Sequence, residues 1–548
     1  MKNKLLFLVI FLGLLPLFNL LTPGLPITHD GTDHVARIAN FYTGLSDGVL
    51  FPRWGGNLNW GYGHPVMMFL YPFSSYLASF FHLVGFTFVD SLKILFALGF
   101  VASGITMYLW VKEQFGEKYA VVSAVIYMYA PYRFVDLYVR GAIGEHMAFI
   151  FPPLILYFAY RYFQDKQYVC PSLIGISISF GLLLLAHNAI SLMFFPVFFL
   201  YVLFLGLSQK KYKKFVFIGL SFLIGFLLSS FFVIPAFLEG KFTLRDIVTG
   251  EEYKDRFITN PLSLLYGGWN YGITGQFTTQ IGLVNILGLI LSPIFFLRSK
   301  SKEMRIFFGI ILLLIASSLF LTISYSNFIY DLITTFKKFQ FPWRFLSLSV
   351  FLTAVLTPAV LLTIKDKKLQ KILMVLLILI AIIPTATYWR AKEYKTIPDS
   401  FYEGIYYGTT DTGESAPIWS VRFMERVPTA QSEIIEGSGS IKTINRSSIV
   451  HEYEIEAFTK LRVRENTLYF PGWSVLDNGK KLEIEFQDPS NRGLITYYLE
   501  PGTHQIKIVF LDTKLRSFAN ALSILSLVSI IGMCIYFIYQ KYGASKKK

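Results

Sequence analysis

The chain has 548 residues, of which 54% are hydrophobic and only 16% are charged, and its formal net charge is +15. This composition excludes a soluble globular protein and indicates one that crosses a membrane several times. The positive charge does not indicate nucleic-acid binding, because the lysines gather in short loops between apolar runs and no basic stripe is interleaved with aromatic residues.

Runs without charge that are long enough to approach ~30 Å of hydrocarbon predict twelve membrane spans. The first run is preceded by basic residues, but no small-x-small pattern follows it, so it is interpreted as a retained span and not as a cleaved signal peptide. The twelve runs lie near residues 5–21, 91–111, 119–132, 147–160, 170–186, 189–207, 215–235, 281–297, 306–323, 345–364, 372–388 and 518–540.

A further apolar stretch, residues 65–84, decides the predicted topology. Its prolines and its His82 suit an interfacial or re-entrant segment better than a helix that faces lipid. If this stretch does not span, the basic loops fall on the same side as Lys2 and Lys4, as the positive-inside rule prefers. The chain is then a multi-pass protein of the cell membrane with both termini cytoplasmic. The basic segments concerned are residues 210–214, 298–305, 365–371 and 546–548.

On the outer side, this topology places five loops and one separate domain. We expect a transmembrane domain over residues 1–389, an outer β domain over 390–516, and a last helix with a basic tail over 517–548. The loops are expected at residues 23–89, 131–146, 187–188, 236–280 and 324–343.

Residues 390–516 show the alternation of apolar and polar residues that is typical of strands with one buried face. Turn signals at Asp477-Asn478-Gly479 and Pro501-Gly502 separate these runs. The pattern predicts a small antiparallel sandwich, which serves either as a structural cap or as a carbohydrate-binding domain. The alternating runs are residues 451–456, 461–464, 481–486 and 505–510.

An ionisable cluster follows the first span. Asp30, Asp33, His34 and Arg37 are spaced i, i+3, i+4, i+7, so a helix would present all four from one face. A plainer interpretation makes Asp30 an N-cap with Asp33 in the first turn, and His34 and Arg37 a solvated face.

The second outer loop is also polar. Asp136 and Arg140 form an i, i+4 pair if the segment is helical, and Glu145-His146 stands at the entry to the fourth span. Alternatively, Asp136 and Arg140 form only a local ion pair of little value. The interiors of the spans hold almost no ionisable residue, which favours chemistry at the membrane boundary over transport through the bilayer.

Several motifs in this order resemble two groups of membrane proteins. An Asp beyond the first span, a long first outer loop and a carboxyl-terminal outer domain resemble the GT-C glycosyltransferase superfamily. The motifs more closely resemble YfhO-type membrane proteins, a group that overlaps the family labelled "6-pyruvoyl-tetrahydropterin synthase-related". They are His29-Asp30, Phe51-Pro52-Arg53-Trp54, Gly61-Tyr62-Gly63, Arg140-Gly141-Ala142, His187-Asn188, Phe339-Gln340-Phe341-Pro342-Trp343-Arg344 and Tyr469-Phe470-Pro471-Gly472-Trp473.

The pterin label does not describe the chemistry, because a pterin synthase needs a soluble scaffold and a zinc site of three histidines. The resemblance instead implies transfer of a sugar from a polyprenyl-phosphate donor to an envelope glycan, lipid or protein on the outer face. It points to Asp30 as general base, with Asp33 second and His34 orienting or sharing the proton.

Positive charge must offset the lipid phosphate that leaves in such a reaction. Arg344, at the outer mouth of the tenth predicted span, is the first candidate, although it can also be read as an interfacial snorkelling residue. Arg37 is the second candidate, and Asp136, Arg140, Glu145 and His146 would complete the wall of the site.

No cofactor is required by the sequence. A divalent cation such as Mg²⁺ or Mn²⁺ could also take part, and the sequence leaves this open. The side chains that could supply oxygen ligands are Asp30, Asp33, Asp136 and Glu145. Two other functions also stay open. One is a flippase or exporter of lipid-linked glycans, and the other is a non-catalytic protein that binds envelope glycan.

Overall fold

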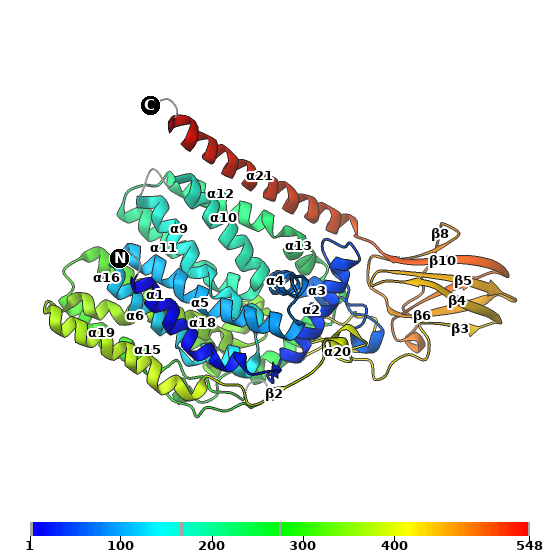
Figure 1. Cartoon of the computed structure of the whole chain (residues 1–548), viewed down its shortest axis with the longest axis horizontal. Helices are drawn as coiled ribbons and strands as arrows, with labels where there is room; N and C mark the ends of the chain where they lie inside the picture. Colours follow the sequence, from blue (N-terminus) through cyan, green and yellow to red (C-terminus); the bar gives the residue numbers. More distant parts are fainter. Residues whose placement is uncertain (1–3, 165–168, 273–275, 411, 546–548) are drawn as a thin grey trace.

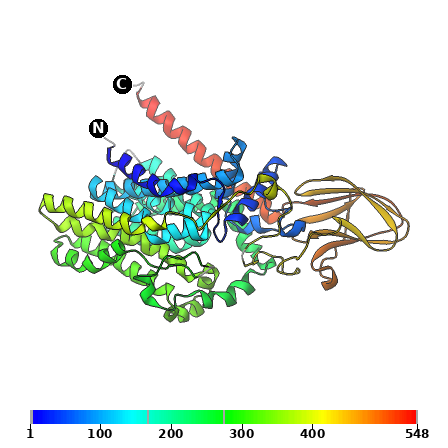
Figure 2. The ribbon, with the colours of Figure 1, turned by 60° about the horizontal axis from the view of Figure 1, so that its bottom comes forward.

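The structure is a computed structural model that describes residues 4–545 apart from 165–168, 273–275 and 411. A body of helices occupies one end of the molecule and a β domain the other, and the last helix runs back along the body (Figure 1). Both termini lie at the end of the body that is remote from the β domain, as Figures 1 and 2 agree.

Short helices interrupt the series of long apolar helices in the first part of the chain. They lie on residues 23–89 and 131–146, which keep here the names that the predicted topology gives them, the first and second outer loops. The elements are α1 (Lys4–Leu14), which continues as a 3₁₀ segment (Leu15–Leu21), α2 (Gly31–Ser46), α3 (Val66–Phe69), α4 (Phe73–Leu83), α5 (Phe88–Phe115), α6 (Glu117–Met128), α7 (Pro131–Phe134), α8 (Ile143–Ala148), α9 (Phe151–Gln164), α10 (Val169–Ala186) and α11 (Asn188–Ser208).

The second part of the helical body follows the same pattern. Its elements are α12 (Lys214–Leu228), α13 (Ser230–Leu238), α14 (Arg245–Glu252), α15 (Leu283–Arg298), α16 (Lys302–Thr322), α17 (Asn327–Leu332), a 3₁₀ turn (Pro342–Phe345), α18 (Leu346–Ala359), α19 (Lys367–Ile382), α20 (Asp399–Glu403) and α21 (Lys514–Ser545).

Within the described residues, nine helices are long and apolar enough to cross a membrane. A tenth span exists if α12 and α13, which meet at an angle of 74°, are counted together. Of the twelve expected spans, nine thus correspond to helices of this kind, one corresponds to the bent pair, and two are shorter apolar helices. The run at 119–132 becomes α6, which ends at Met128 because Pro131 begins a new helix, and the run at 281–297 becomes α15. At 1.5 Å per residue, both helices are shorter than the hydrocarbon thickness.

The stretch at residues 65–84 does not span, as predicted. It forms α3 and α4, which Pro72 separates, and neither is among the membrane-spanning helices of the described chain.

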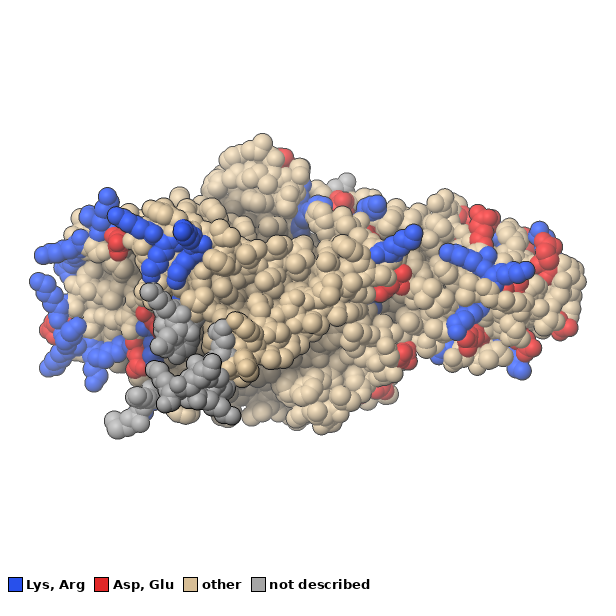
Figure 3. Space-filling model, turned by 90° about the horizontal axis from the view of Figure 1, so that it is seen from above, with Lys and Arg blue, Asp and Glu red and all other residues tan. Residues whose placement is uncertain are grey.

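Lysine and arginine side chains gather at the end of the body remote from the β domain (Figure 3). Lys2 and the lysines at 546–548 lie outside the described residues.

The β domain consists of two antiparallel sheets. One has the order β4-β5-β10-β7-β8 and the other the order β3-β6-β9. Three of the predicted runs are strands, and the turn at Asn478-Gly479 joins β7 to β8. The strands are β3 (Ser432–Glu436), β4 (Gly439–Arg446), β5 (Val450–Ala457), β6 (Leu461–Leu468), β7 (Trp473–Asp477), β8 (Lys480–Leu482), β9 (Leu494–Leu499) and β10 (Gly502–Phe510).

The predicted strand at 481–486 is only half present. β8 ends at Leu482, and Glu485 then exchanges two backbone hydrogen bonds of 2.8 Å with Thr496 of the other sheet. The chain changes sheets at this point, so one alternating run is divided between two partners.

Residues 390–431 precede the strands and pass over the first outer loop. We call the described residues of this segment, 390–410 and 412–431, the strap. Its β2 (Tyr394–Lys395) pairs with β1 (Leu25–Pro26) directly before α2. The strap therefore fixes the start of the first outer loop.

The motif at residues 51–54 joins the β domain to the helices. Pro235 of α13 lacks an N–H, which leaves the Phe231 carbonyl without its helical donor. Arg53 Nη2 donates to this carbonyl at 2.9 Å and to Asn520 of α21 at 2.7 Å, while Nη1 donates to Asp512 at 3.1 Å. Arg53 is thus a structural clamp.

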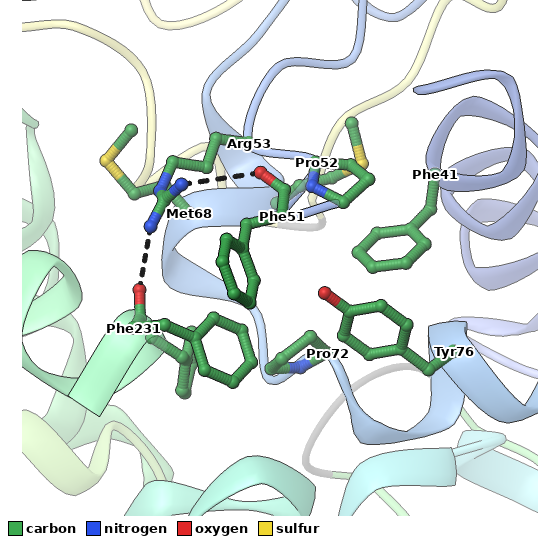
Figure 4. Close-up of a pocket in the computed structure, with 10 residues that line it drawn as sticks. Phe41, Phe51, Pro52, Arg53, Met68, Pro72, Tyr76 and Phe231 are labelled. Atoms are coloured by element: carbon green, nitrogen blue, oxygen red, sulfur yellow. Dashed lines mark hydrogen bonds between the residues drawn. The ribbon is translucent and has the colours of Figure 1, made fainter. Parts of the chain in front are cut away.

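The Arg53 clamp lines a small pocket with about 240 Å³ of empty volume (Figure 4). The walls are mostly apolar and come from the first outer loop and α13. They are Phe41, Phe51, Pro52, Arg53, Met67, Met68, Pro72, Tyr76, Phe231 and Phe232. None of the ionisable candidates for the functional site belongs to this lining.

Candidate functional site

The first outer loop turns into α2 through a tight polar corner. The Gly31 N–H donates to Thr28 Oγ1 at 3.1 Å, and a Cβ at Gly31 would lie 2.6 Å from that oxygen. Asp30 occupies the N-cap position, but its side chain accepts no capping hydrogen bond from the helix. The plainer interpretation expected the Asp30 side chain to cap α2. The half-buried carboxylate does not do so.

The second outer loop pairs with this corner through its backbone. The His29 and Asp30 N–H groups donate to the carbonyls of Val139 and Arg140, each at 2.9 Å. Gly141 has a φ of +69°, and a Cβ there would lie 2.2 Å from Thr28 Oγ1. The Arg-Gly-Ala motif therefore needs its glycine for the close approach that brings Arg140 to Asp30.

A buried ion cluster lies beneath the corner. Arg140 Nη1 is 2.5 Å from Asp136 Oδ1 and 2.9 Å from Glu145 Oε2. The Asp136 side chain is fully buried and that of Arg140 is 6% exposed. The expected i, i+4 pair is confirmed, on a π-helical turn (Val135–Arg140), and both of its members are buried.

Arg344 and Tyr132 complete this cluster from two further directions. Arg344 Nε lies 3.7 Å from Glu145 Oε2, and Arg344 Nη1 donates to the Phe339 carbonyl at 2.7 Å. The Tyr132 hydroxyl donates to Glu145 Oε1 at 2.6 Å. The Arg344 side chain is only 11% exposed, so it does not snorkel to a surface.

Two carboxylates therefore share one guanidinium, with a second guanidinium close by. Asp136 Oδ2 and Arg344 Nε are buried and make no hydrogen bond within the described residues. Burial alone would lower the pKa of Arg140, but Glu145, Tyr132, Asp136 and Asp30 together raise it well above its ordinary value. Arg140 therefore stays charged.

The predicted face of α2 is present, but it is buried. His34 and Arg37 are each 6% exposed, so they do not form a solvated face. Burial, and then the guanidinium groups of Arg37 and Arg140, lower the pKa of His34 well below its ordinary value. His34 is consequently a neutral imidazole whose Nδ1 lies 3.4 Å from Arg37 Nη1.

The Asp33 carboxylate contacts the strap and Arg37. The Tyr406 hydroxyl donates to Asp33 Oδ1 at 2.7 Å, and Arg37 Nη2 lies 3.4 Å from Asp33 Oδ2. Arg37 Nε also donates to the Thr409 carbonyl at 2.6 Å. These contacts tie Asp33 to the strap and to the next turn of α2.

His146 stands apart from this assembly. It belongs to α8, and its Nε2 lies 3.0 Å from the Phe96 carbonyl of α5. The Phe96 and Phe100 rings pack against it. The structure thus brings together the other eight predicted residues and directs His146 toward a helix interface.

Besides Tyr132, two residues beside the cluster, His187 and Tyr71, were missed as site residues. His187 Nδ1 caps α11 by accepting a hydrogen bond from the Ile190 N–H at 3.3 Å. Its ring also stacks on Tyr71 at 4.5 Å. Burial, followed by Arg344 and Arg140, lowers its pKa well below the ordinary value. The only signal in the sequence was a polar His-Asn pair between apolar runs.

The cluster does not fit a metal ion. In the part of the chain that the structure describes, no group of three or more His, Cys, Asp or Glu side chains could hold one. Asp136 and Glu145, two of the expected ligands, instead direct oxygens at the Arg140 guanidinium. Two permanent cations, the guanidinium groups of Arg140 and Arg344, already lie against these carboxylates.

Fold and site together describe a multi-pass membrane protein with a buried ion cluster beside a half-buried carboxylate. The family described as "6-pyruvoyl-tetrahydropterin synthase related domain; membrane protein" matches residues 68–391, which is more than half of the chain. The chain belongs to this family, and the resemblance inferred from the motifs is confirmed. No curated protein matches the sequence.

Among solved structures, the arabinofuranosyltransferase AftD from Mycobacteria aligns with 71% of this chain and 27% of its own, with 14% identity and a TM-score of 0.49. The oligosaccharyltransferase AglB from Archaeoglobus fulgidus, in complex with an inhibitory peptide and a dolichol-phosphate, aligns with 75% of this chain and 56% of its own. That match has 15% identity and a TM-score of 0.38. This chain thus spans about a quarter of the length of AftD and somewhat over half of the length of AglB. Both resemblances are distant, and neither identifies a catalytic residue here.

Proposed function

We propose that the protein is a membrane glycosyltransferase. It moves a sugar from a polyprenyl-phosphate donor to an envelope glycan, lipid or protein on the outer face of the cell membrane. The observation that carries the proposal is the placement of Asp30, a half-buried carboxylate without a capping role, beside the buried guanidinium of Arg140.

The Asp30 carboxylate acts as general base. It takes the proton from the acceptor hydroxyl while that oxygen attacks the anomeric carbon of the donor sugar. The bond between this carbon and the phosphate oxygen breaks, and the lipid phosphate leaves with the electron pair. Neutral His34, one turn along α2, orients the carboxylate or shares its proton.

Positive charge stabilises the phosphate as it leaves. Arg344 is the first candidate, because its Nε makes no hydrogen bond within the described residues and only a 3.7 Å contact with Glu145. Asp136 and Glu145 hold Arg140 in place, and Arg37 closes the wall toward the strap. The mechanism requires no metal ion.

The proposed orientation puts both termini in the cytoplasm and the site and β domain outside. The basic loops lie at the end remote from the β domain (Figure 3), which agrees with the positive-inside rule. Residues 1–389 would then form the catalytic membrane domain, residues 390–516 an outer domain, and residues 517–548 the return to the cytoplasm.

The test is transfer of labelled sugar by the full chain in nanodiscs, with a panel of polyprenyl-phosphate sugars and solubilised envelope material as acceptor. We expect label in the acceptor fraction for one donor, and no label with heat-denatured protein. Absence of transfer from every donor refutes the proposal.

Parallel proteoliposome assays separate the two alternatives. Movement of an intact lipid-linked glycan across the bilayer without transfer would identify a flippase. Retention of envelope glycan without transfer or movement would identify a binding protein.

A further inference from the structure

A strained turn lies at residues 59–61 of the first outer loop. Asn59 and Trp60 have φ values of 54° and 60°, and Gly61 follows with 84°. Two consecutive residues with side chains rarely adopt this left-handed region, and such conformations cluster at functional sites. The strain marks a segment whose shape is imposed by its surroundings.

The strap imposes this shape. The Trp60 N–H donates to the Tyr406 carbonyl at 2.9 Å, and the Asn59 N–H donates to the Gly408 carbonyl at 3.2 Å. The Met424 N–H donates to Asn59 Oδ1 at 3.0 Å. The turn therefore holds the Trp60 indole at a fixed place beside the strap.

Trp60 and Tyr407 together form an aromatic surface, which we call the Trp60–Tyr407 platform. Their ring centroids are 6.0 Å apart, and the Tyr407 ring lies 4.6 Å from that of Tyr406. Tyr407 is 53% exposed and Trp60 is half-buried. The two rings are tilted by 48° to each other, and Tyr407 is the ring that is exposed to solvent.

The platform is adjacent to the proposed reaction site. Tyr406, between the platform and α2, donates to Asp33. A Cβ at Gly408 would lie 2.6 Å from Asp33 Oδ1, so only glycine lets the strap approach this closely. Burial, Asp33 and the Tyr407 hydroxyl all raise the pKa of Tyr406, which keeps its proton and donates it. Asp33 is one helical turn from Asp30.

We propose that the Trp60–Tyr407 platform binds a sugar ring of the acceptor, so that the acceptor is a saccharide. One face of a sugar ring carries C–H groups that pack on aromatic rings, while its hydroxyls remain available to polar side chains. This inference rests on the proposed function and specifies its acceptor class. A saccharide on the platform extends past Asp33 toward Asp30.

The experiment measures binding of fluorescent hexasaccharides of glucose, mannose, galactose and N-acetylglucosamine to the full chain in nanodiscs. We expect at least one of them to bind the wild type. Trp60→Ala and Tyr407→Ala should each weaken its dissociation constant about tenfold. Tyr407→Phe keeps the ring and should bind like the wild type.

Tyr212→Ala is the matched control, because Tyr212 is 55% exposed, much like Tyr407, and lies in the basic loop between α11 and α12, outside both the first outer loop and the β domain. It should leave binding unchanged. Since Tyr407 is exposed, its alanine variant should keep the melting temperature of the wild type, which separates lost binding from lost folding. The inference is overturned if no hexasaccharide binds the wild type at millimolar concentration, or if both platform variants bind like the wild type. In the second case the platform is a membrane-interface anchor.

The proposed function and this inference can fail separately. Saccharide binding that depends on the platform, in a protein that transfers no sugar, supports the inference and refutes the enzyme. Transfer with an unchanged acceptor KM in both platform variants supports the enzyme and refutes the inference.

Discussion

Glu145 and Glu465 are both buried glutamates with an arginine Nη1 at 2.9 Å, yet their surroundings differ. Glu465 of β6 also has His451 at 2.8 Å and the Thr467 hydroxyl at 3.2 Å. These partners all come from the β domain itself. The Glu465 cluster ties strands together and needs no other explanation.

Glu145 belongs to an assembly of a different kind. Its neighbours come from the first outer loop, the second outer loop and the segment before α18, and they include a second acid and a second arginine. A half-buried carboxylate, Asp30, stands at its edge. The comparison teaches that burial of an ion pair does not by itself indicate a site. The useful signals are distant segments that converge and an acid that stays accessible.

The largest expected effect on stability is that of Arg140→Ala. It leaves Asp136 and Glu145 buried without their shared cation, so the free energy of unfolding should fall by about 3–5 kcal/mol. Chemical denaturation in detergent, followed by tryptophan fluorescence, measures the loss. A loss below about 1 kcal/mol would mean that the cluster is not a coupled unit.

Arg446→Ala makes the corresponding change in the β domain. Glu465 keeps His451 and Thr467 as partners, so the loss should be smaller, about 1–3 kcal/mol. Hydrogen exchange of the β5 and β6 amides shows whether this loss of stability is confined to the β domain. Sugar transfer per folded molecule should stay at the wild-type level, and a change in transfer would contradict the division between the two clusters.

Mild acid should loosen the β domain. Burial lowers the pKa of His451 below its ordinary 6.5, so below pH 6.5 the unfolded state binds a proton that the folded state does not. His451 and Arg446 lower the pKa of Glu465 despite its burial, so its stabilising contribution is present above pH 4.5 and is lost as the pH falls further.

Stability of the β domain should therefore decrease as the pH falls from 7 to 5, and decrease again below 4.5. Hydrogen exchange corrected for the intrinsic pH dependence is the measurement, with His451→Gln as the variant that should flatten the first phase. An equal response in this variant and the wild type would assign the effect to another group.

Tyr406→Phe should have the smallest effect. It removes one hydrogen bond, to Asp33, and keeps the ring, so unfolding should become easier by about 0.5–1.5 kcal/mol. Because Asp33 is treated as a positioning residue, transfer should fall only a few-fold. A loss of transfer activity as large as that of an Asp30 variant would indicate that Asp33, and not Asp30, is the general base.

Features that depend on neighbours in sequence could be predicted. The non-spanning stretch at 65–84, the three alternating strands, and the Asp33–Arg37 and Asp136–Arg140 pairs follow from periodicity or from i, i+4 spacing. Errors arose where another part of the chain decides the outcome. The strand at 481–486 is divided because Glu485 pairs with a different sheet.

The site shows the same limit. The Tyr406–Asp33 hydrogen bond joins residues 373 positions apart, and no local pattern indicates it. The burial of His34 and Arg37 could not be predicted either, because the strap and the second outer loop cover α2. The four ionisable residues were recognisable as a set, but the contacts that hold Asp33, from Tyr406 and Arg37, become visible only in the packing.

The most direct test of the central claim compares Asp30→Asn with Asp33→Asn in the transfer assay, at matched expression and with melting temperatures recorded. If Asp30 is the general base, Asp30→Asn should lose about 10²–10⁴-fold in kcat while donor binding is retained. Asp33→Asn should keep most of the rate. Equal and nearly full activity in both variants would contradict the account and leave the α2 acids a structural role only.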